Sequence, residues 1–228
     1  MPPRADPIIC TVDVVLLTLR GDQLQVLLQQ REQAPFEGRL ALPGGYIHAQ
    51  ADQGAWEAAA RVLREKTGID SPYLEQLATF SGPGRDPRGW SVSIAHYALV
   101  PDSLLPATDA RLRLWPVVRL PALPFDHRSI VDAALSRVRS KSHYSSLPVH
   151  LCGESFTLPQ LQGVYEAVLG EAVNKVSFRR KMEELGMLEP IEGALSQGGA
   201  HRPAQLWRLR REYRRELSTI DRGLAVRG

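Results

Sequence analysis

The stretch between residues 42 and 69, LPGGYIHAQADQGAWEAAARVLREKTGI, limits the possible folds of this chain more than any other segment. Gly44 and Gly45 interrupt a short strand and predict a turn or a close approach of two backbones. From Asp52, which can cap a helix, nonpolar residues recur every three or four positions, and Gly68 can end the helix. We therefore predict a strand, a tight glycine loop and a helix of about four turns.

This stretch resembles the Nudix box, whose pattern is G-x5-E-x7-R-E-U-x-E-E-x-G-U with U an aliphatic residue. The matching positions are Arg61, Leu63, Glu65, Gly68 and Ile69. Gly44 and Gly45 match the loop that precedes the box. The resemblance implies a site in which glutamates on one helix face hold Mg²⁺ against a diphosphate.

The departures from the pattern affect the carboxylates that would bind this metal. Val62 and Lys66 replace two glutamates, and the upstream glutamate is missing whether it is counted from Gly45 or from Arg61. Only Glu65 remains, and a lysine beside it repels Mg²⁺. One carboxylate binds Mg²⁺ weakly unless substrate phosphates supply most of the ligands. We therefore expect Glu65 to be a weak metal ligand at best, and catalysis to be weakened or lost.

The charges in this region are also compatible with a purely structural role. Glu57, Arg61 and Glu65 are spaced for an i, i+4 ladder of ion pairs on a solvated helix face. In the loop SGPGRDPRG, Arg85 and Arg88 have the chemistry to present two guanidiniums to a phosphate, and a turn with solubilising charges explains them equally well.

The remainder of the first part of the chain predicts an α+β architecture. Residues 8–20 and 24–30 form a hairpin pattern around a glycine turn. The further expected elements are strands over 74–80, 90–100 and 113–118, and a helix over 129–139. We predict a Nudix-type α/β/α sandwich over residues 1–148, with the junction to a second domain, residues 149–228, inside the segment 141–157.

The second domain has the element order of a winged helix-turn-helix. Thr157 and Gln160 form a capping-box signal at the start of a first helix. A second helix over 174–185 follows a short turn, and strands over 188–191 and 206–209 then flank a glycine-rich tip.

Basic and amide side chains crowd the start of this second helix. The candidate DNA-contacting residues are Asn174, Lys175, Ser177, Arg179, Arg180 and Lys181. Phe178, Met182 and Leu185 predict a buried face opposite to them, which leaves the polar face for the major groove of DNA. His201 and Arg202 follow the tip and are placed to contact phosphates or the minor groove. The alternative is a set of ordinary solvated charges.

The amino-acid composition limits the kinds of binding site and the cellular compartments that we expect. The net charge is only +3, so a basic binding site has to be local. Two cysteines, Cys10 and Cys152, are too few for a disulfide framework and favour a reduced cytoplasmic setting. We see no signal peptide, and the nonpolar stretch over residues 8–19 is too short to span a membrane.

Together the two halves resemble the NrtR family, the Nudix-related transcriptional regulators of NAD metabolism. The resemblance implies a homodimeric repressor of NAD synthesis or salvage genes that binds a palindromic operator. It implies an effector, ADP-ribose or a related NAD metabolite, and no required cofactor. Gly44, Gly45, Arg61 and Glu65 would then belong to the effector site, with Arg85 and Arg88 as phosphate contacts.

A different class of protein is also compatible with the first half. A working Nudix hydrolase would cleave ADP-ribose or a similar nucleoside diphosphate with Mg²⁺, and its basic tail would serve oligomerisation only. A regulator with residual hydrolysis combines both. The sequence leaves open the operator, the regulated genes, the identity of the effector and whether it lifts or strengthens repression.

Overall fold

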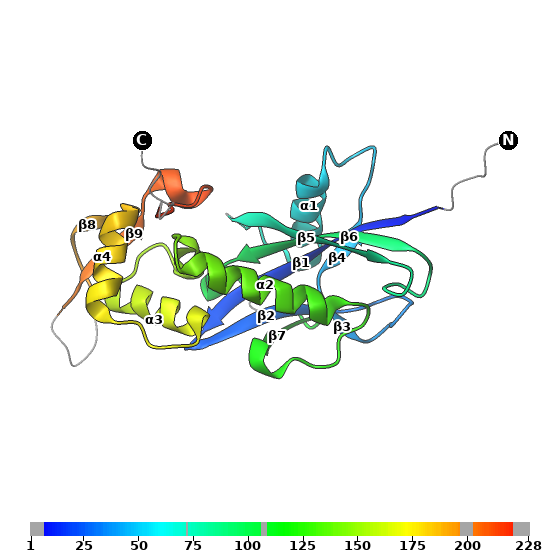
Figure 1. The fold of residues 1–228 in the computed structure, drawn as a ribbon, viewed down its shortest axis with the longest axis horizontal. Helices are drawn as coiled ribbons and strands as arrows, with labels where there is room; N and C mark the ends of the chain where they lie inside the picture. Colours follow the sequence, from blue (N-terminus) through cyan, green and yellow to red (C-terminus); the bar gives the residue numbers. More distant parts are fainter. Residues whose placement is uncertain (1–6, 72, 106–108, 197–202, 221–228) are drawn as a thin grey trace, which may run out of the picture. The chain divides into compact units, whose positions relative to one another are not determined.

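The structure, a computed structural model, describes residues 7–71, 73–105, 109–196 and 203–220 (Figure 1). The chain divides into two compact units, Met1–Ser136 and Arg137–Gly228. The boundary predicted between residues 148 and 149 lies further along the chain. The segment expected to be a junction contains a buried 3-10 helix, η3 (Leu147–Leu151), whose Val149 belongs to the core of the second unit.

A seven-stranded mixed sheet forms the centre of the first unit. Its strands are β1 (Ile9–Arg20), β2 (Gln23–Gln30), β3 (Leu40–Ala41), β4 (Gly44–Tyr46), β5 (Leu74–Gly82), β6 (Ser91–Leu99) and β7 (Leu112–Pro116). The main order is β3-β2-β1-β6-β5, while β4 pairs with β1 and β7 pairs with β2. Strands β1 and β6 are parallel, and β1 and β2 form the predicted hairpin around Gly21.

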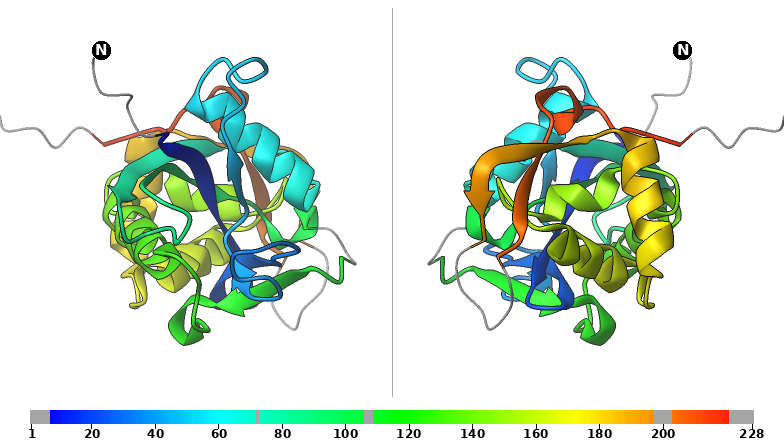
Figure 2. Two further views of the ribbon diagram at one scale, coloured as in Figure 1. Left: turned by 90° about the vertical axis from the view of Figure 1, so that its right-hand side faces the viewer. Right: turned by 90° about the vertical axis from the view of Figure 1, so that its left-hand side faces the viewer.

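Two helices, α1 (Ala55–Thr67) and α2 (His127–Ser142), cover opposite faces of this sheet (Figure 2). The alternation of side chains along β1 explains the arrangement, because successive residues of a strand point to opposite faces. Val12 and Val14 pack in one cluster with Leu63 of α1, whereas Asp13 faces His127 at the start of α2. The structure therefore confirms the predicted α/β/α sandwich.

The start of α1 differs from the sequence prediction. The helix begins at Ala55 after an extended Gly54, and no side chain caps it. Asp52, the predicted cap, accepts a hydrogen bond from the backbone N–H of His48 and binds Arg61. The predicted end is confirmed, because Gly68 adopts the left-handed conformation with φ 71° and its N–H donates to Arg64 O.

The second unit pairs two helices with a two-stranded sheet. Its elements are α3 (Leu158–Leu169), α4 (Lys175–Leu185), β8 (Leu188–Leu195), β9 (Gln205–Leu209) and the 3-10 helix η4 (Arg211–Arg214). The capping box of Thr157 and Gln160 is present as predicted. Phe178 of α4 stacks edge-on against Tyr165 of α3, with ring centroids 5.6 Å apart, inside a nonpolar core. This element order is that of the predicted winged helix.

Two further short 3-10 helices, η1 (Asp102–Leu104) and η2 (Val117–Arg119), lie in the loops of the first unit. In the part of the chain that the structure describes, no helix has both the length and the nonpolar character needed to cross a membrane.

Candidate functional sites

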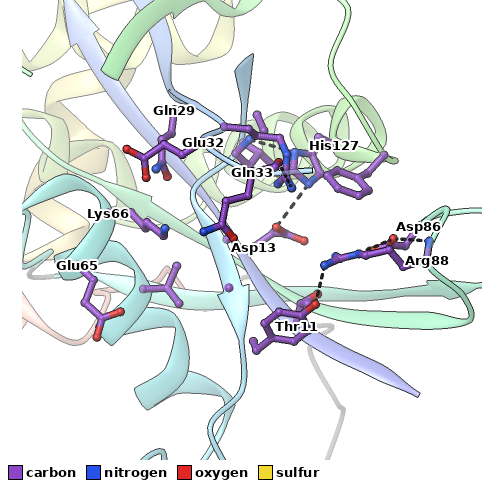
Figure 3. Close-up of a pocket in the computed structure, with 18 of the residues that line it drawn as sticks. Thr11, Asp13, Gln29, Glu32, Gln33, Glu65, Lys66, Asp86, Arg88 and His127 are labelled. Carbon is purple, nitrogen blue, oxygen red and sulfur yellow. Dashed lines mark hydrogen bonds and ion pairs between the residues drawn. The ribbon is translucent and has the colours of Figure 1, made fainter. Parts of the chain in front are cut away.

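The first candidate site is a cavity of about 360 Å³ in the first unit (Figure 3). Its walls come from β1, β2, the glycine loop, α1, the loop after β5 and the start of α2. The volume lies within the range of small-molecule sites. All six predicted effector-site residues line this cavity: Gly44, Gly45, Arg61, Glu65, Arg85 and Arg88.

The two glycines allow the loop to lie close against its neighbours. A Cβ atom at Gly44 would lie 2.2 Å from Oδ1 of Asp13, and one at Gly45 would lie 2.9 Å from Cγ2 of Val62. Neither distance is compatible with a side chain unless the neighbour moves. The close approach that the sequence predicts is therefore confirmed, and Gly44 and Gly45 are needed for packing in this fold.

Arg61 holds the loop that follows β4. Its Nε and Nη2 donate to the two carboxylate oxygens of Asp52, both at 2.8 Å, and Nη2 also donates to the carbonyl of Tyr46 at 3.0 Å. The hydrogen bonds from Arg61 hold the pKa of Asp52 far below its ordinary value. Nη1 of Arg61 contacts Oε2 of Glu65 at 3.1 Å. Among the described residues Asp52, and not Glu57, is the second acidic partner, so half of the predicted ladder forms.

The box residues do not fit a Mg²⁺ ion. Val62 is 1% exposed and packs in the nonpolar core beneath Gly45. Glu65, whose side chain is 56% exposed, is already paired with Arg61. Lys66 brings an ammonium group into the wall of the cavity. Within the described ranges, no group of three or more His, Cys, Asp or Glu side chains is placed to hold a metal ion.

Arg85 has a different environment from the one expected of a free phosphate ligand. Its side chain is 7% exposed, and its guanidinium makes hydrogen bonds of 3.0 and 2.9 Å to the carboxylate of Asp126. A longer contact of 3.5 Å reaches Asp13. Its positive charge is therefore neutralised by carboxylates of the fold, and Arg85 mainly braces the wall of the cavity.

Arg88 is more accessible and also has a carboxylate partner. It donates to Asp86, with the shortest contact 2.7 Å, and its Nη1 donates to the hydroxyl of Tyr46 at 2.6 Å. Burial would raise the pKa of Asp86, but the hydrogen bonds from Arg88 lower it below its ordinary value. This pair presents one guanidinium edge and one aromatic ring to the cavity.

A buried polar group links the glycine loop to α2. Nδ1 of His127 accepts a hydrogen bond from the backbone N–H of Leu42 at 3.0 Å, so the ring proton lies on Nε2, which is 3.5 Å from Oδ1 of Asp13. Ser93 also donates to Asp13, at 2.7 Å. Burial would raise the pKa of Asp13, but His127 and these hydrogen bonds lower it, and its carboxylate stays charged.

Arg31 is a cavity residue that the sequence did not reveal. It follows the end of β2, and its guanidinium donates to the carbonyls of Pro35 and Gln33 while lying 4.9 Å from the centre of the Phe125 ring. Burial and the positive charge of Arg88 lower the pKa of Arg31 below its ordinary value. No motif spacing marks this residue, because its role depends on contacts with distant parts of the chain.

The second candidate site is the exposed face of α4. Lys175, Ser177, Arg179 and Arg180 are exposed, while Phe178 is buried as predicted. Arg180 makes a loose contact of 3.7 Å with Glu184. Val176, which the sequence analysis did not single out, is 76% exposed on the first turn. His201 and Arg202 lie outside the described residues.

Two of the residues predicted to face DNA have local structural roles. The side-chain oxygen of Asn174 caps α4 by accepting hydrogen bonds from the N–H groups of Val176 and Ser177, at 3.0 and 3.1 Å. Lys181 is half-buried, and its ammonium donates to the carbonyl of Ser142 and lies 4.9 Å from the centre of the Tyr165 ring. The prediction that all six polar residues share one exposed face is therefore wrong for Lys181.

Comparison with known proteins agrees with both parts of the fold. A NUDIX domain model matches residues 11–133, and a model described as the NrtR DNA-binding winged helix domain matches residues 148–209. The ADPR responsive transcriptional repressor NtrR of Acinetobacter baylyi is 40% identical over 204 residues, which cover 87% of this chain and 80% of the relative. The chain belongs to the NrtR family.

Solved structures of NrtR extend the similarity to the fold. NrtR of Shewanella oneidensis, crystallised with a 27mer DNA, is 39% identical, with a TM-score of 0.82 over 88% of this chain and 93% of that chain. Its NUDIX domain, solved in complex with ADP ribose, is 38% identical, with a TM-score of 0.53 over 60% of this chain and 92% of that chain. These matches cover both halves of the NrtR architecture.

Proposed function

We propose that this protein is a transcriptional repressor of NAD synthesis or salvage genes, and that its Nudix cavity senses ADP-ribose or a related NAD metabolite. The observation that carries the proposal is that one chain joins a Nudix cavity that keeps only Glu65 of its box carboxylates to a winged helix with exposed cations. Two relatives support it. One is named an ADPR responsive transcriptional repressor, and the NrtR structures were solved with DNA and, for the NUDIX domain, with ADP ribose.

The exposed face of α4 is suited to the major groove. Arg179 and Arg180 have the donors that bind guanine edges or phosphates, and Lys175 adds a charge at the first turn. A winged helix reads a short half-site, so we propose that the protein binds a palindromic operator as a homodimer in the cytoplasm. Wing residues His201 and Arg202 would contact the flanking backbone.

The cavity is suited to a nucleoside diphosphate. Arg31 and Lys66 line it, and Arg88 presents a guanidinium edge beside the ring of Tyr46. Effector and operator would favour different arrangements of the dimer. By linkage each then weakens the binding of the other by the same free energy, typically ~1–3 kcal/mol.

The alternative is an active Mg²⁺-dependent ADP-ribose pyrophosphatase, or a regulator with residual hydrolysis. The residues at positions 62 and 66 weigh against efficient metal catalysis, because Val62 is nonpolar and packed in the core beside the cavity, and Lys66 carries a positive charge. Mg²⁺ would matter only for such residual hydrolysis. Incubation with Mg²⁺ and ADP-ribose tests this directly, and rapid release of AMP would favour the enzyme.

A gel-shift titration tests the regulatory proposal. The full-length chain is used to select duplexes from a random pool, and ADP-ribose, NAD or AMP is then added to the complex. We expect a palindromic consensus and release of the duplex by ADP-ribose. The absence of any preferred sequence would contradict the DNA assignment, and indifference to all three nucleotides would contradict the effector assignment.

A further inference from the structure

Lys66 occupies a position in the cavity wall where the Nudix pattern has a metal-binding glutamate. It follows Glu65 on α1, yet the two side chains point in different directions (Figure 3). Both residues line the cavity, but Lys66 is half-buried in its wall, while Glu65 is exposed and pairs with Arg61. The helix therefore presents an ammonium group where a carboxylate with Mg²⁺ would otherwise face a ligand.

The charges of the other cavity cations are largely compensated by the protein itself. Arg61 is bound to Asp52, Arg85 to Asp126 and Arg88 to Asp86; these three pairs are closer than 3 Å. In the described part of the chain, Lys66 has no acidic side chain within ion-pair distance. Among the described residues, Arg31 donates hydrogen bonds only to backbone carbonyls and lies over the face of Phe125, while the charges of Asp86 and Asp13 act on it without forming an ion pair.

Two cations that form no ion pair with a described carboxylate gain from an added anion when they lose contact with water. A diphosphate carries two negative charges at neutral pH, and Mg²⁺ usually neutralises them in enzymes that use one or two carboxylates to hold the metal. A lysine and an arginine supply the same total charge without a metal, and charge-assisted hydrogen bonds to phosphate oxygens are among the stronger polar contacts.

We propose that Lys66 takes the place of the metal ion, so that with Arg31 it binds the diphosphate of the effector without any divalent cation. The inference rests on the proposed function, since it concerns how the same cavity holds a nucleoside diphosphate. It goes beyond loss of catalysis. The lysine at position 66, where the Nudix pattern has a glutamate, removes a metal ligand and also provides the positive charge that the metal would have supplied.

Calorimetric titration of the full-length protein with ADP-ribose, in EDTA and again in Mg²⁺, tests the proposal. Wild-type affinity should be the same within about twofold in both buffers. Lys66→Met, which keeps most of the length of the side chain without its charge, should weaken binding about 10- to 100-fold in EDTA. Lys66→Arg should retain most of the affinity. Lys66→Glu should bind poorly in EDTA and recover part of its affinity when Mg²⁺ is added.

Arg64→Met is the matched control. Arg64 lies on the same helix outside the cavity and pairs with Asp70 at the surface, so its removal changes the net charge by the same amount without touching the site. Its affinity for ADP-ribose should equal that of wild type. Thermal unfolding of each variant checks that the fold is intact.

The possible failures are distinct. Wild-type binding that requires Mg²⁺ overturns the metal-free site while leaving the proposed effector in place. Unchanged affinity in a folded Lys66→Met variant overturns the role of Lys66. No heat and no binding of ADP-ribose to wild type in either buffer overturns the proposed effector itself, and the metal-free site with it.

Discussion

Two helices of this protein carry several positive charges, and among the described residues the arginines of α1 are paired with carboxylates whereas two cations of α4 are not. On α1, Arg61 is bound to Asp52 and Glu65, and Arg64 is bound to Asp70. On α4, Lys175 and Arg179 are exposed and make no ion pair with any described residue. An arginine that is paired with a carboxylate of the protein mainly stabilises the local structure. A cation without such an ion pair gains more free energy from binding an external phosphate. The presence or absence of an ion pair therefore distinguishes a structural charge from a ligand-binding charge.

The largest expected effect comes from removing two exposed charges of α4. Arg179→Ala combined with Arg180→Ala should weaken binding of the selected duplex at least about a hundredfold, since each contact to a base or phosphate contributes roughly 1–3 kcal/mol. Fluorescence anisotropy at several salt concentrations measures this, and the salt dependence should also become shallower. Affinity for ADP-ribose should not change. Retained DNA affinity would contradict the distinction between the two helices.

A carboxylate introduced on the buried face of α1 tests whether an additional charge is tolerated on this helix. Val62→Glu buries a carboxylate beneath Gly45 and should destabilise the first unit by roughly 2–4 kcal/mol. Chemical unfolding measures the loss, and Val62→Ile is the conservative control. The double variant with Val62→Glu and Lys66→Glu restores two box carboxylates and should have a higher affinity for Mg²⁺ than wild type. Wild-type stability of Val62→Glu would mean that the core next to the glycine loop is looser than the structure shows.

Burial of a histidine makes the second unit sensitive to acid. In the second unit, burial lowers the pKa of His150 to about 4, whereas an unfolded chain takes up this proton near pH 6.5. The unfolded state therefore binds more protons between these values, and stability should fall by a few kcal/mol as pH drops from about 6.5 to 4. Thermal unfolding across this range measures the slope, which His150→Gln should flatten. An unchanged slope in that variant would assign the acid sensitivity to other groups.

The smallest effect concerns an uncharged residue on the α4 face. Val176 is 76% exposed beside Ser177 and Arg179, where a nonpolar side chain can contact a thymine methyl group. Val176→Ala should weaken binding of the duplex by about 1 kcal/mol. Replacing the contacted thymine by uracil should then have no further effect on the affinity of that variant. Val118→Ala, at an equally exposed position of the first unit, serves as the control. If the losses of affinity from Val176→Ala and from the change of thymine to uracil add up, Val176 does not contact that methyl group.

Local signals in the sequence were sufficient for the features that depend on neighbouring residues. The end of α1 at Gly68 and the capping box of Thr157 follow from backbone geometry or from hydrogen bonds within four residues. The glycine pair predicted a close approach, but its partner Asp13 lies far away in the sequence and is seen only in the structure. The buried face of α4 follows from helical periodicity. These properties predict the fold and the identity of both domains.

The partners of charged residues could not be predicted in the same way. Arg85 meets Asp126 across 41 positions of the sequence, and Lys181 reaches Ser142 across 39. Such contacts exist only after the sheet or the helices have packed, so charge and spacing alone suggested free cations. Arg31 was missed for the same reason. The motif identified the cavity, while only the folded chain shows which of its charges remain available.

The tight fit of Gly44 against Asp13 has a consequence for how sequences of this kind are classified. The steric demand at Gly44 is independent of whether a phosphate bond is ever broken, so a repressor and a hydrolase built on this sandwich face the same requirement. A search that relies on the glycine signature will therefore group sensors with enzymes. Inspection of the acidic positions that follow is what separates the two.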